Sequence, residues 1–325
     1  MVVSSVLQEK YPGYCVKDVA INWHGTKMAV CSNNCVDIWS KNSQDQWIKE
    51  PVGIDLDKSK VIQRVTWTHP EFGQVLAMST LNEITIWEFT ADSGGTWINR
   101  TTQTISEPRH LVINDVKFSP AYSGVVKNRN LELAYCTDSG QGQLKIWRCK
   151  NANDLKDWEI VKEINAKEPF TFTCLDWYVS PSESLIAVGT VDNSVREQQG
   201  QVRLYEYDTQ RQDWLFRDVV AKSLNSKVYD VSFAPNPGRS FHTVAVAASD
   251  LQVKSFRLEG DRISLVREKE NVVDDQENRV QVWKVSWSCL GTSLCTTGDD
   301  GLLRMWKNSA HWECTRKLKW NGVEP

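Results

Sequence analysis

The stretch that decides the fold runs from Asp18-Val19-Ala20-Ile21-Asn22-Trp23 to Asp37-Ile38-Trp39. An alternating strand opens near an aspartate, a turn and a short apolar run follow, and a later strand closes on an aromatic residue. The pattern occurs six times, near residues 18–39, 64–87, 115–147, 174–205, 230–256 and 284–306. The closing aromatic residues recur roughly every 50 to 60 positions, a little further apart than in a typical WD repeat. They are Trp39, Trp87, Trp147, Tyr205, Phe256 and Trp306.

A repeat of this kind is one four-stranded blade of a β-propeller, because each unit has an apolar face that it can bury only against its neighbours. The chain has 325 residues, of which 15 are Trp, and large aromatic side chains suit packing between blades. No Pro-, Gly- or Ser-rich linker interrupts the repeats. The sequence therefore predicts an all-β, WD-repeat β-propeller with six blades, formed as a single domain over residues 1–325.

Charge and hydropathy argue against two classes of partner. The formal net charge is −3 and the pI is near 6.0, without the basic stripe expected of a nucleic-acid-binding protein. The N-terminus lacks the features of a signal peptide, and no stretch reaches the roughly 18 apolar residues of a membrane helix. We expect an intracellular protein that neither contacts nucleic acid directly nor inserts into a membrane.

The sequence also argues against a metal site and an enzyme. Its nine cysteines include no CxxC pair, and the spacing of Cys31 and Cys35 near His24 does not match a structural zinc site. The five histidines lie in different repeats or turns, and no nucleophile elbow, Walker loop or dinucleotide-binding motif is present. The acidic segment Gly298-Asp299-Asp300-Gly301 falls where a repeat needs a tight hairpin. We expect no cofactor, no metal and no catalytic residues.

Three longer segments depart from the repeat, at residues 121–130, 191–201 and 267–279. The second and third are rich in charge, which favours solvated loops. The alternative is that one of them becomes ordered on a partner.

The two chain ends suggest where a partner binds. Residues 311–320 alternate well enough to be a fourth strand of the sixth blade, so the strand predicted at residues 2–7 has no evident place there. We therefore expect an open ring whose seam, between the first and sixth blades, accepts strands from another protein by β-augmentation. The predicted partner-binding residues are Val2, Val3, Val6, Leu7, Val19, Ile21, Trp23, Val285, Trp287, Leu303 and Met305.

Several segments carry a family resemblance that runs from the first repeat to the last. They are residues 67–77, 233–242, 281–287, 298–301 and 312–322. Together they make the chain similar to the Sec-thirteen-homologue family of nucleoporins. In the first two repeats, Ser32-Asn33-Asn34-Cys35 and Ser79-Thr80-Leu81-Asn82 replace the common Ser-x-Asp turns.

The resemblance implies a non-catalytic scaffold subunit of the Y-shaped coat of the nuclear pore complex, at the nuclear envelope. It implies an open six-bladed propeller that is completed by a β-blade from an α-solenoid nucleoporin, together with contacts to other Y-complex subunits. It also implies a place in the GATOR/SEA complex, bound to its solenoid subunit at the cytoplasmic face of the lysosome or vacuole, in target-of-rapamycin signalling.

Two alternatives remain open. The first is the related outer-coat propeller of COPII vesicles, although Phe72 and residues 238–242 favour the nucleoporin family. The second is a propeller that serves as substrate receptor of a ubiquitin ligase. No basic or aromatic-lined peptide pocket can be identified from the sequence to support it.

Overall fold

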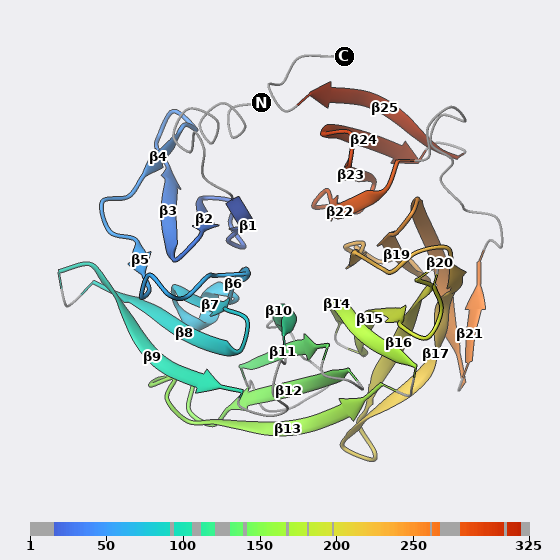
Figure 1. Ribbon diagram of the computed structural model, residues 1–325, viewed down its shortest axis with the longest axis horizontal. Coiled ribbons are helices and arrows are strands. Elements are labelled where there is room, and N and C mark those ends of the chain that lie inside the picture. The colour runs from blue at the N-terminus through green and yellow to red at the C-terminus, as the bar shows by residue number, and fades with distance from the viewer. Residues whose placement is uncertain are drawn as a thin grey trace. The chain divides into compact units, whose positions relative to one another are not determined.

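The computed structural model describes residues 16–91, 94–105, 112–120, 131–138, 142–166, 169–180, 182–196, 198–260, 262–266, 280–308 and 311–319. The chain forms two compact units, Met1–Asn165 and Ala166–Pro325, and each contains three antiparallel sheets (Figure 1). The described residues form strands and one short 3-10 helix, η1 (Pro70–Phe72), without an α-helix. Each sheet is one blade, so the predicted all-β, six-bladed β-propeller is confirmed.

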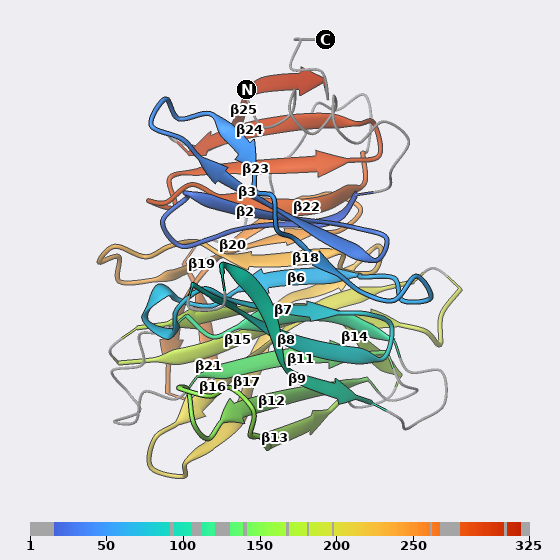
Figure 2. The same cartoon turned by 90° about the vertical axis from the view of Figure 1, so that its left-hand side faces the viewer.

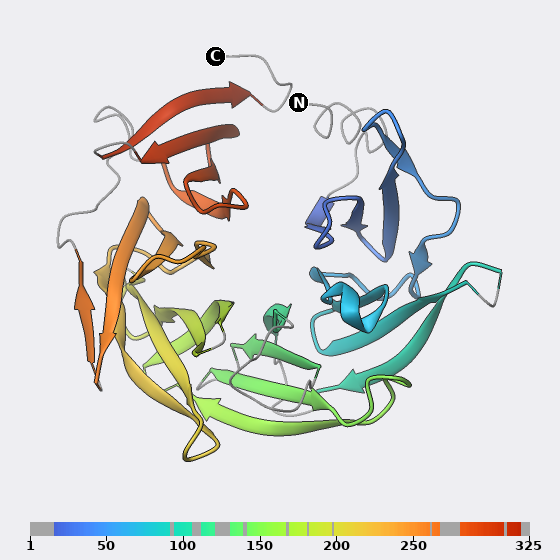
Figure 3. The same ribbon diagram turned by 180° about the vertical axis from the view of Figure 1, so that it is seen from behind.

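The first unit contains the first three blades. The first blade consists of β1 (Val16–Ile21), β2 (Lys27–Ser32), β3 (Cys35–Lys41), β4 (Trp47–Lys49) and β5 (Ile54–Asp55). The second blade consists of β6 (Arg64–Trp67), β7 (Val75–Ser79), β8 (Glu83–Thr90) and β9 (Thr96–Thr104), which follow one another in order in Figure 2. The third blade consists of β10 (Ile113–Phe118), β11 (Glu132–Thr137), β12 (Gln143–Cys149) and β13 (Trp158–Asn165). Figure 3 shows the same unit from behind, with η1 between β6 and β7.

The second unit contains the other three blades. The fourth blade consists of β14 (Phe170–Val179), β15 (Ser184–Asp192), β16 (Gly200–Asp208) and β17 (Asp213–Leu224). The fifth blade consists of β18 (Asp230–Phe233), β19 (His242–Ala247), β20 (Leu251–Glu259) and β21 (Arg262–Leu265). The sixth blade consists of β22 (Val282–Trp287), β23 (Ser293–Gly298), β24 (Leu302–Asn308) and β25 (Trp312–Lys319). The predicted fourth strand of the sixth blade is therefore present as β25.

The first blade differs from the others at its outer edge. Both β4 and β5 pair with β3, so two short strands occupy the place of one. Pro51 lies between them and has no N–H group to donate to a ladder. Gly53 follows, where a Cβ atom would lie 2.6 Å from the carbonyl oxygen of Val36. The local sequence therefore interrupts the outer strand and brings the chain back against β3.

Apolar side chains from adjacent blades pack together within each unit. In the first unit, Val75 and Ala77 of the second blade share a buried cluster with Val116 and Leu133 of the third. The second unit repeats this arrangement between its blades. Five of the six closing aromatic residues are buried, whereas Trp87 is half-buried. The closing position is therefore mostly a buried packing position, which a large aromatic side chain fills.

The Gly298–Gly301 segment is a hairpin turn, as predicted. It joins β23 to β24, and the amide of Gly301 donates to the carbonyl of Gly298. The Asp300 carboxylate lies 2.5 Å from the Arg304 guanidinium, whose hydrogen bond lowers the pKa of Asp300. Both carboxylates of the turn are engaged within the chain, since Asp299 accepts from the indole of Trp283. Residues 191–201 belong to the β15–β16 hairpin, whereas residues 121–130 and 267–279 lie outside the described residues.

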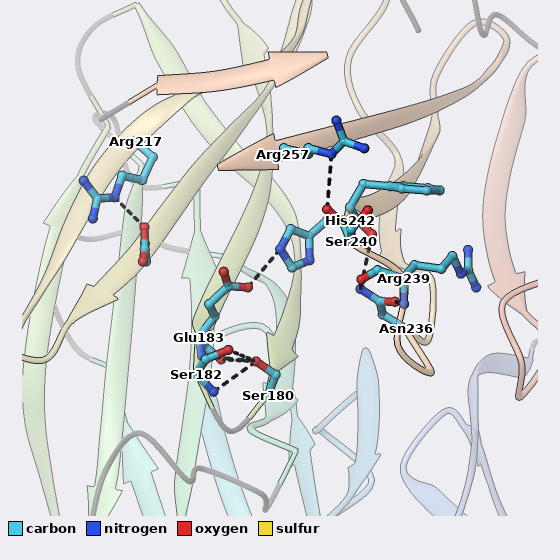
Figure 4. A network of polar contacts seen from close by, with 11 residues as sticks. Ser180, Ser182, Glu183, Arg217, Asn236, Arg239, Ser240, His242 and Arg257 are labelled. Atoms are coloured by element: carbon cyan, nitrogen blue, oxygen red, sulfur yellow. Dashed lines mark hydrogen bonds and ion pairs between the residues drawn. The ribbon is translucent and has the colours of Figure 1, made fainter. Parts of the chain in front are cut away.

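A histidine–carboxylate contact joins the fourth and fifth blades inside the second unit (Figure 4). His242 Nε2 lies 2.9 Å from Glu183 Oε2, and the imidazole lies between the rings of Tyr178 and Phe256. The hydrogen bond from His242 lowers the pKa of the Glu183 carboxyl group. A carboxyl group with a lowered folded-state pKa stabilises the fold above its unfolded-state pKa, and this contribution is lost as the pH falls through the folded-state value.

We predict that Glu183→Gln lowers the free energy of unfolding at pH 7 by about 1 kcal/mol, because the pair is partly solvated. The difference from wild type should shrink as the pH falls below about 4.5, and it is lost once the pH is below the lowered folded-state pKa of Glu183. Denaturant titrations at several pH values measure this difference in the free energy of unfolding. Glu313→Gln, which changes an exposed carboxylate, is the control; a difference between wild type and Glu183→Gln that does not change with pH would contradict the prediction.

A second prediction concerns the closing aromatic residue of the sixth blade. Trp306 is 2% exposed, and its indole N–H donates to Thr296 Oγ1 at 3.0 Å. Trp306→Ala should lower the free energy of unfolding by about 3–5 kcal/mol, the usual cost of emptying a buried aromatic site. Trp283→Ala, at a half-exposed Trp of the same blade, should lower the free energy of unfolding by clearly less. Equal melting temperatures for the Trp306→Ala and wild-type proteins would show that this aromatic residue does not hold the blade together.

Candidate partner-binding surfaces

The innermost strands of the blades can be aligned by their opening residues. We number the positions from the residue that opens each repeat, so the first position is occupied by Asp18, Arg64, Asp115, Cys174, Asp230 and Lys284. A β-bulge immediately precedes this residue in the first, third, fourth and sixth blades. Because side chains of a strand alternate, residues at even and odd positions face opposite sides of the blade.

Odd positions face the next blade. Asp18 Oδ2 accepts a hydrogen bond from the amide of Val65 in the second blade at 3.1 Å. In the second unit, Asp230 Oδ2 accepts from the amide of Val285 at 3.2 Å. In both pairs a first-position carboxylate binds the second-position amide of the following blade. We call this contact the carboxylate latch.

Even positions face the preceding blade. The indole N–H of Trp67 donates to the carbonyl of Ala20 at 3.1 Å, and that of Trp287 donates to the carbonyl of Ser232 at 3.0 Å. Both tryptophans stand at the fourth position, and both carbonyls belong to the third position of the preceding blade. In these pairs the even positions are bound to the preceding blade, although the charged first-position side chains of Asp115 and Lys284 also reach a residue of the preceding blade.

This rule places Val19 and Ile21 on the face of the first blade that points away from the second. They are 39% and 54% exposed, although both are aliphatic. Their cross-strand partners on β2 are Val30 and Met28, which belong to a small buried cluster with Trp39 and Trp47. We call this face, with Val19 and Ile21 at its inner edge, the outer face of the first blade.

By the same rule, two residues predicted to line the seam contact the fifth blade instead. Val285 and Trp287 stand at even positions and face the fifth blade, where Val285 is buried with Ala247 and Leu251. Trp287 makes the hydrogen bond to Ser232 described above. Val285 and Trp287 therefore hold the fifth and sixth blades together. Their side chains do not reach the other face of the sixth blade, because side chains alternate along β22.

Leu303 and Met305 lie on that opposite face of the sixth blade. They alternate with Arg304 and Trp306 along β24, and both are half-buried. Leu303 pairs with Leu318, and Met305 pairs with Cys295. We call this face the outer face of the sixth blade. The first position of this blade is a lysine, and the aspartate is likewise absent from the second blade (Arg64) and the fourth (Cys174).

Trp23 does not share the outer face of the first blade. It follows β1, and its ring meets that of His69 edge-on with centroids 4.6 Å apart. It also lines a cavity together with Trp67 of the second blade. The remaining predicted residues, Val2, Val3, Val6 and Leu7, lie outside the described part of the chain.

The parity rule is the signal that sequence reasoning missed. Once the Asp at the first position is known to bind the next blade, each second- and fourth-position residue is assigned to the preceding blade. That assignment would have included Val19 and Ile21 and left out Val285 and Trp287.

Nothing in the described residues is arranged as a metal centre, since no group of three His, Cys, Asp or Glu side chains converges there. Burial raises the pKa of the Cys31 thiol to about 12, so this cysteine is a neutral core residue. No helix among the described residues is long and apolar enough to cross a membrane.

The comparisons with known proteins agree with the fold. The family model of the WD domain, G-beta repeat, matches residues 272–307. Nucleoporin SEH1-B of Xenopus laevis is 33% identical over 94% of this chain and 86% of its own length. Nucleoporin SEH1 of Homo sapiens and of Bos taurus are each 32% identical over the same shares.

Six blades built from one repeat, with a WD-domain match in the last, define a WD-repeat β-propeller protein. Within that class, the similarity extends over nearly the whole chain. The chain belongs to the SEH1 family of nucleoporins.

We predict that Asp230→Ala lowers the free energy of unfolding by about 1–3 kcal/mol, because it leaves the amide of Val285 without its acceptor. Asp230 is buried, so water cannot readily replace the carboxylate. Asp57→Ala, at an exposed carboxylate, should change stability by less than about 0.5 kcal/mol. Chemical denaturation of the wild-type, Asp230→Ala and Asp57→Ala proteins measures these differences. An Asp230→Ala variant as stable as wild type would show that the carboxylate latch does not stabilise the blades.

Proposed function

We propose that this protein is a non-catalytic scaffold subunit of the nuclear pore complex. The observation that carries the proposal is the similarity to nucleoporins along 94% of the chain. The fold supports it, because a propeller presents several sheet faces on which other proteins can assemble. COPII outer-coat and ubiquitin-ligase roles have no comparable support.

We further propose that an α-solenoid nucleoporin donates a β-blade to this propeller. The first line of support is the outer face of the first blade, where Val19 and Ile21 occupy the positions that face a preceding blade elsewhere. In the second and sixth blades, the residues at these positions are Val65 with Trp67 and Val285 with Trp287, and each pair is covered by its neighbour. An incoming strand would cover Val19 and Ile21 in the same way.

The second line of support comes from the outer face of the sixth blade. It combines the half-buried side chains of Leu303, Met305 and Leu318. The sixth blade thus carries apolar surface for a neighbour on this side. In the proposed open ring, the donated blade supplies that neighbour.

Membership of a GATOR/SEA complex at the lysosome or vacuole, and contacts with other Y-complex subunits, are further parts of the proposal. They rest on the family resemblance alone. Affinity purification of the tagged full-length protein, followed by mass spectrometry, tests all of these assignments together. Recovery of α-solenoid nucleoporins supports the pore role, whereas exclusive recovery of COPII coat or ubiquitin-ligase subunits contradicts it.

We predict that Val19→Asp combined with Ile21→Asp abolishes association with the solenoid partner. Two buried, unpaired carboxylates would oppose an interface that should bury more than roughly 2,000 Å² if a whole blade is donated. Ile160→Asp is the matched control, because Ile160 is 50% exposed on β13 of the third blade. The measurement is the yield of co-purified partner at equal expression.

The double variant should keep the melting temperature of the free chain within a few degrees, because both residues are already exposed. A partner yield equal to wild type would contradict the assignment of this face. Loss of binding on alteration of residues 267–279 alone would place the contact in that loop instead.

A further inference from the structure

A cavity of about 270 Å³ lies between the first and second blades, inside the first unit. It is formed where the β1–β2 turn meets the β6–β7 connection, and neither segment takes part in the outer faces described above. Its apolar walls are Trp23, Trp67 and Pro70. The volume is smaller than that of a typical drug-sized pocket and suits a single side chain.

The turn that carries Trp23 is held rigidly. Asn22 Oδ1 accepts hydrogen bonds from the amides of Thr26 and Lys27, both at 2.9 Å. On the other side, η1 begins at Pro70, and the ring of His69 packs edge-on against Trp23. Trp23 nevertheless remains 66% exposed. A large aromatic surface is thus fixed in place at the rim of the cavity and left open to solvent.

The hydroxyl group of Thr68, in the lining of the cavity, is not explained by a role in the fold alone. Thr68 lines the cavity and is only 5% exposed, yet its Oγ1 has no hydrogen-bond partner among the described residues. A buried hydroxyl without a partner costs roughly 1–3 kcal/mol of stability. Valine has almost the same shape and would avoid that cost. A hydroxyl in this place is useful if a ligand supplies its partner.

The charges around the cavity restrict the ligand further. No Asp or Glu side chain lines the cavity, so it offers no counter-charge to a cation. The one ammonium group of the lining, that of Lys27, lies 2.5 Å from the Glu50 carboxylate. The lining is therefore close to neutral, and a neutral group is favoured. The flanking aromatic rings favour a flat occupant that can pack edge-on or offset against them.

We propose that this cavity binds a tyrosine side chain presented by an extended segment of a partner protein. Its ring packs between Trp23 and Pro70, over Trp67. Its phenolic hydroxyl, which can both donate and accept, exchanges a hydrogen bond with Thr68 Oγ1. This site is distinct from the outer faces proposed for the donated blade, so a partner can occupy both.

The test uses N-acetyl-tyrosinamide and N-acetyl-phenylalaninamide as probes on the full-length protein. The indole resonance of Trp23 is assigned by its absence in Trp23→Phe. Titration with the tyrosine amide should shift this resonance and saturate, and the phenylalanine amide should bind at least fivefold more weakly. Buried polar groups left unpaired by the phenylalanine ring are the reason for the difference.

Thr68→Val separates a ligand-binding hydroxyl from a structural one. This variant should bind the two amides with equal affinity, while its melting temperature is no lower than that of wild type. Trp23→Ala should remove the saturable response, which is then followed at neighbouring backbone amides. The control Trp283→Ala changes a half-exposed Trp of the second unit and should bind the tyrosine amide as wild type does.

Three results would overturn the proposal. They are a wild-type protein that does not distinguish the two amides, a Thr68→Val variant that still prefers the tyrosine amide, and an equal loss of binding in Trp283→Ala. A Thr68→Val variant that unfolds at a lower temperature would show that the hydroxyl serves the fold.

Discussion

The carboxylate latch is a hydrogen bond between neighbouring blades that recurs in both units, from the first blade to the second and from the fifth to the sixth. A first-position aspartate binds a backbone amide of the following blade, and a fourth-position tryptophan returns a hydrogen bond to the preceding one. The second unit repeats both contacts with Asp230 and Trp287. The donor and acceptor of each contact lie on the innermost strands of two neighbouring blades. The two contacts therefore stabilise the packing of the blades and also fix how these strands are aligned with each other. Apolar burial alone would leave that alignment less well defined.

The carboxylate latch also makes the contact between two blades directional, because the acceptor lies on one blade and the donor on the next. Every blade that carries it holds its successor, and every second-position amide that is bound identifies a predecessor. The blade donation proposed above would have to fit this polarity. On the first blade, the donated strand would take the place of a predecessor at Val19 and Ile21.

Much of the fold could be predicted from the sequence, because the repeat carries its own period. The six openings, the closing aromatic residues and the β25 strand follow from alternation alone. The split outer strand of the first blade could not be foreseen, since it depends on where Pro51 and Gly53 fall against β3. Of the predicted partner-binding residues, Val19 and Ile21 share an outer face, whereas Val285 and Trp287 do not. Both pairs are apolar in the sequence. In the structure they differ because Val285 is buried against the fifth blade and Trp287 donates to the Ser232 carbonyl, whereas Val19 and Ile21 are exposed. Thr68 could not be recognised from the sequence at all, because an unpaired hydroxyl is a property of its surroundings.

The divided outer edge of the first blade has a consequence for assembly. A long, flat edge strand invites pairing with any other chain, and that is a route to aggregation. In the first blade the outer strands contain only three and two residues, and a proline separates them. An invading strand would find no continuous ladder to extend there. The short, divided outer edge thus protects the first blade against edge-to-edge pairing, independently of whichever protein covers its outer face.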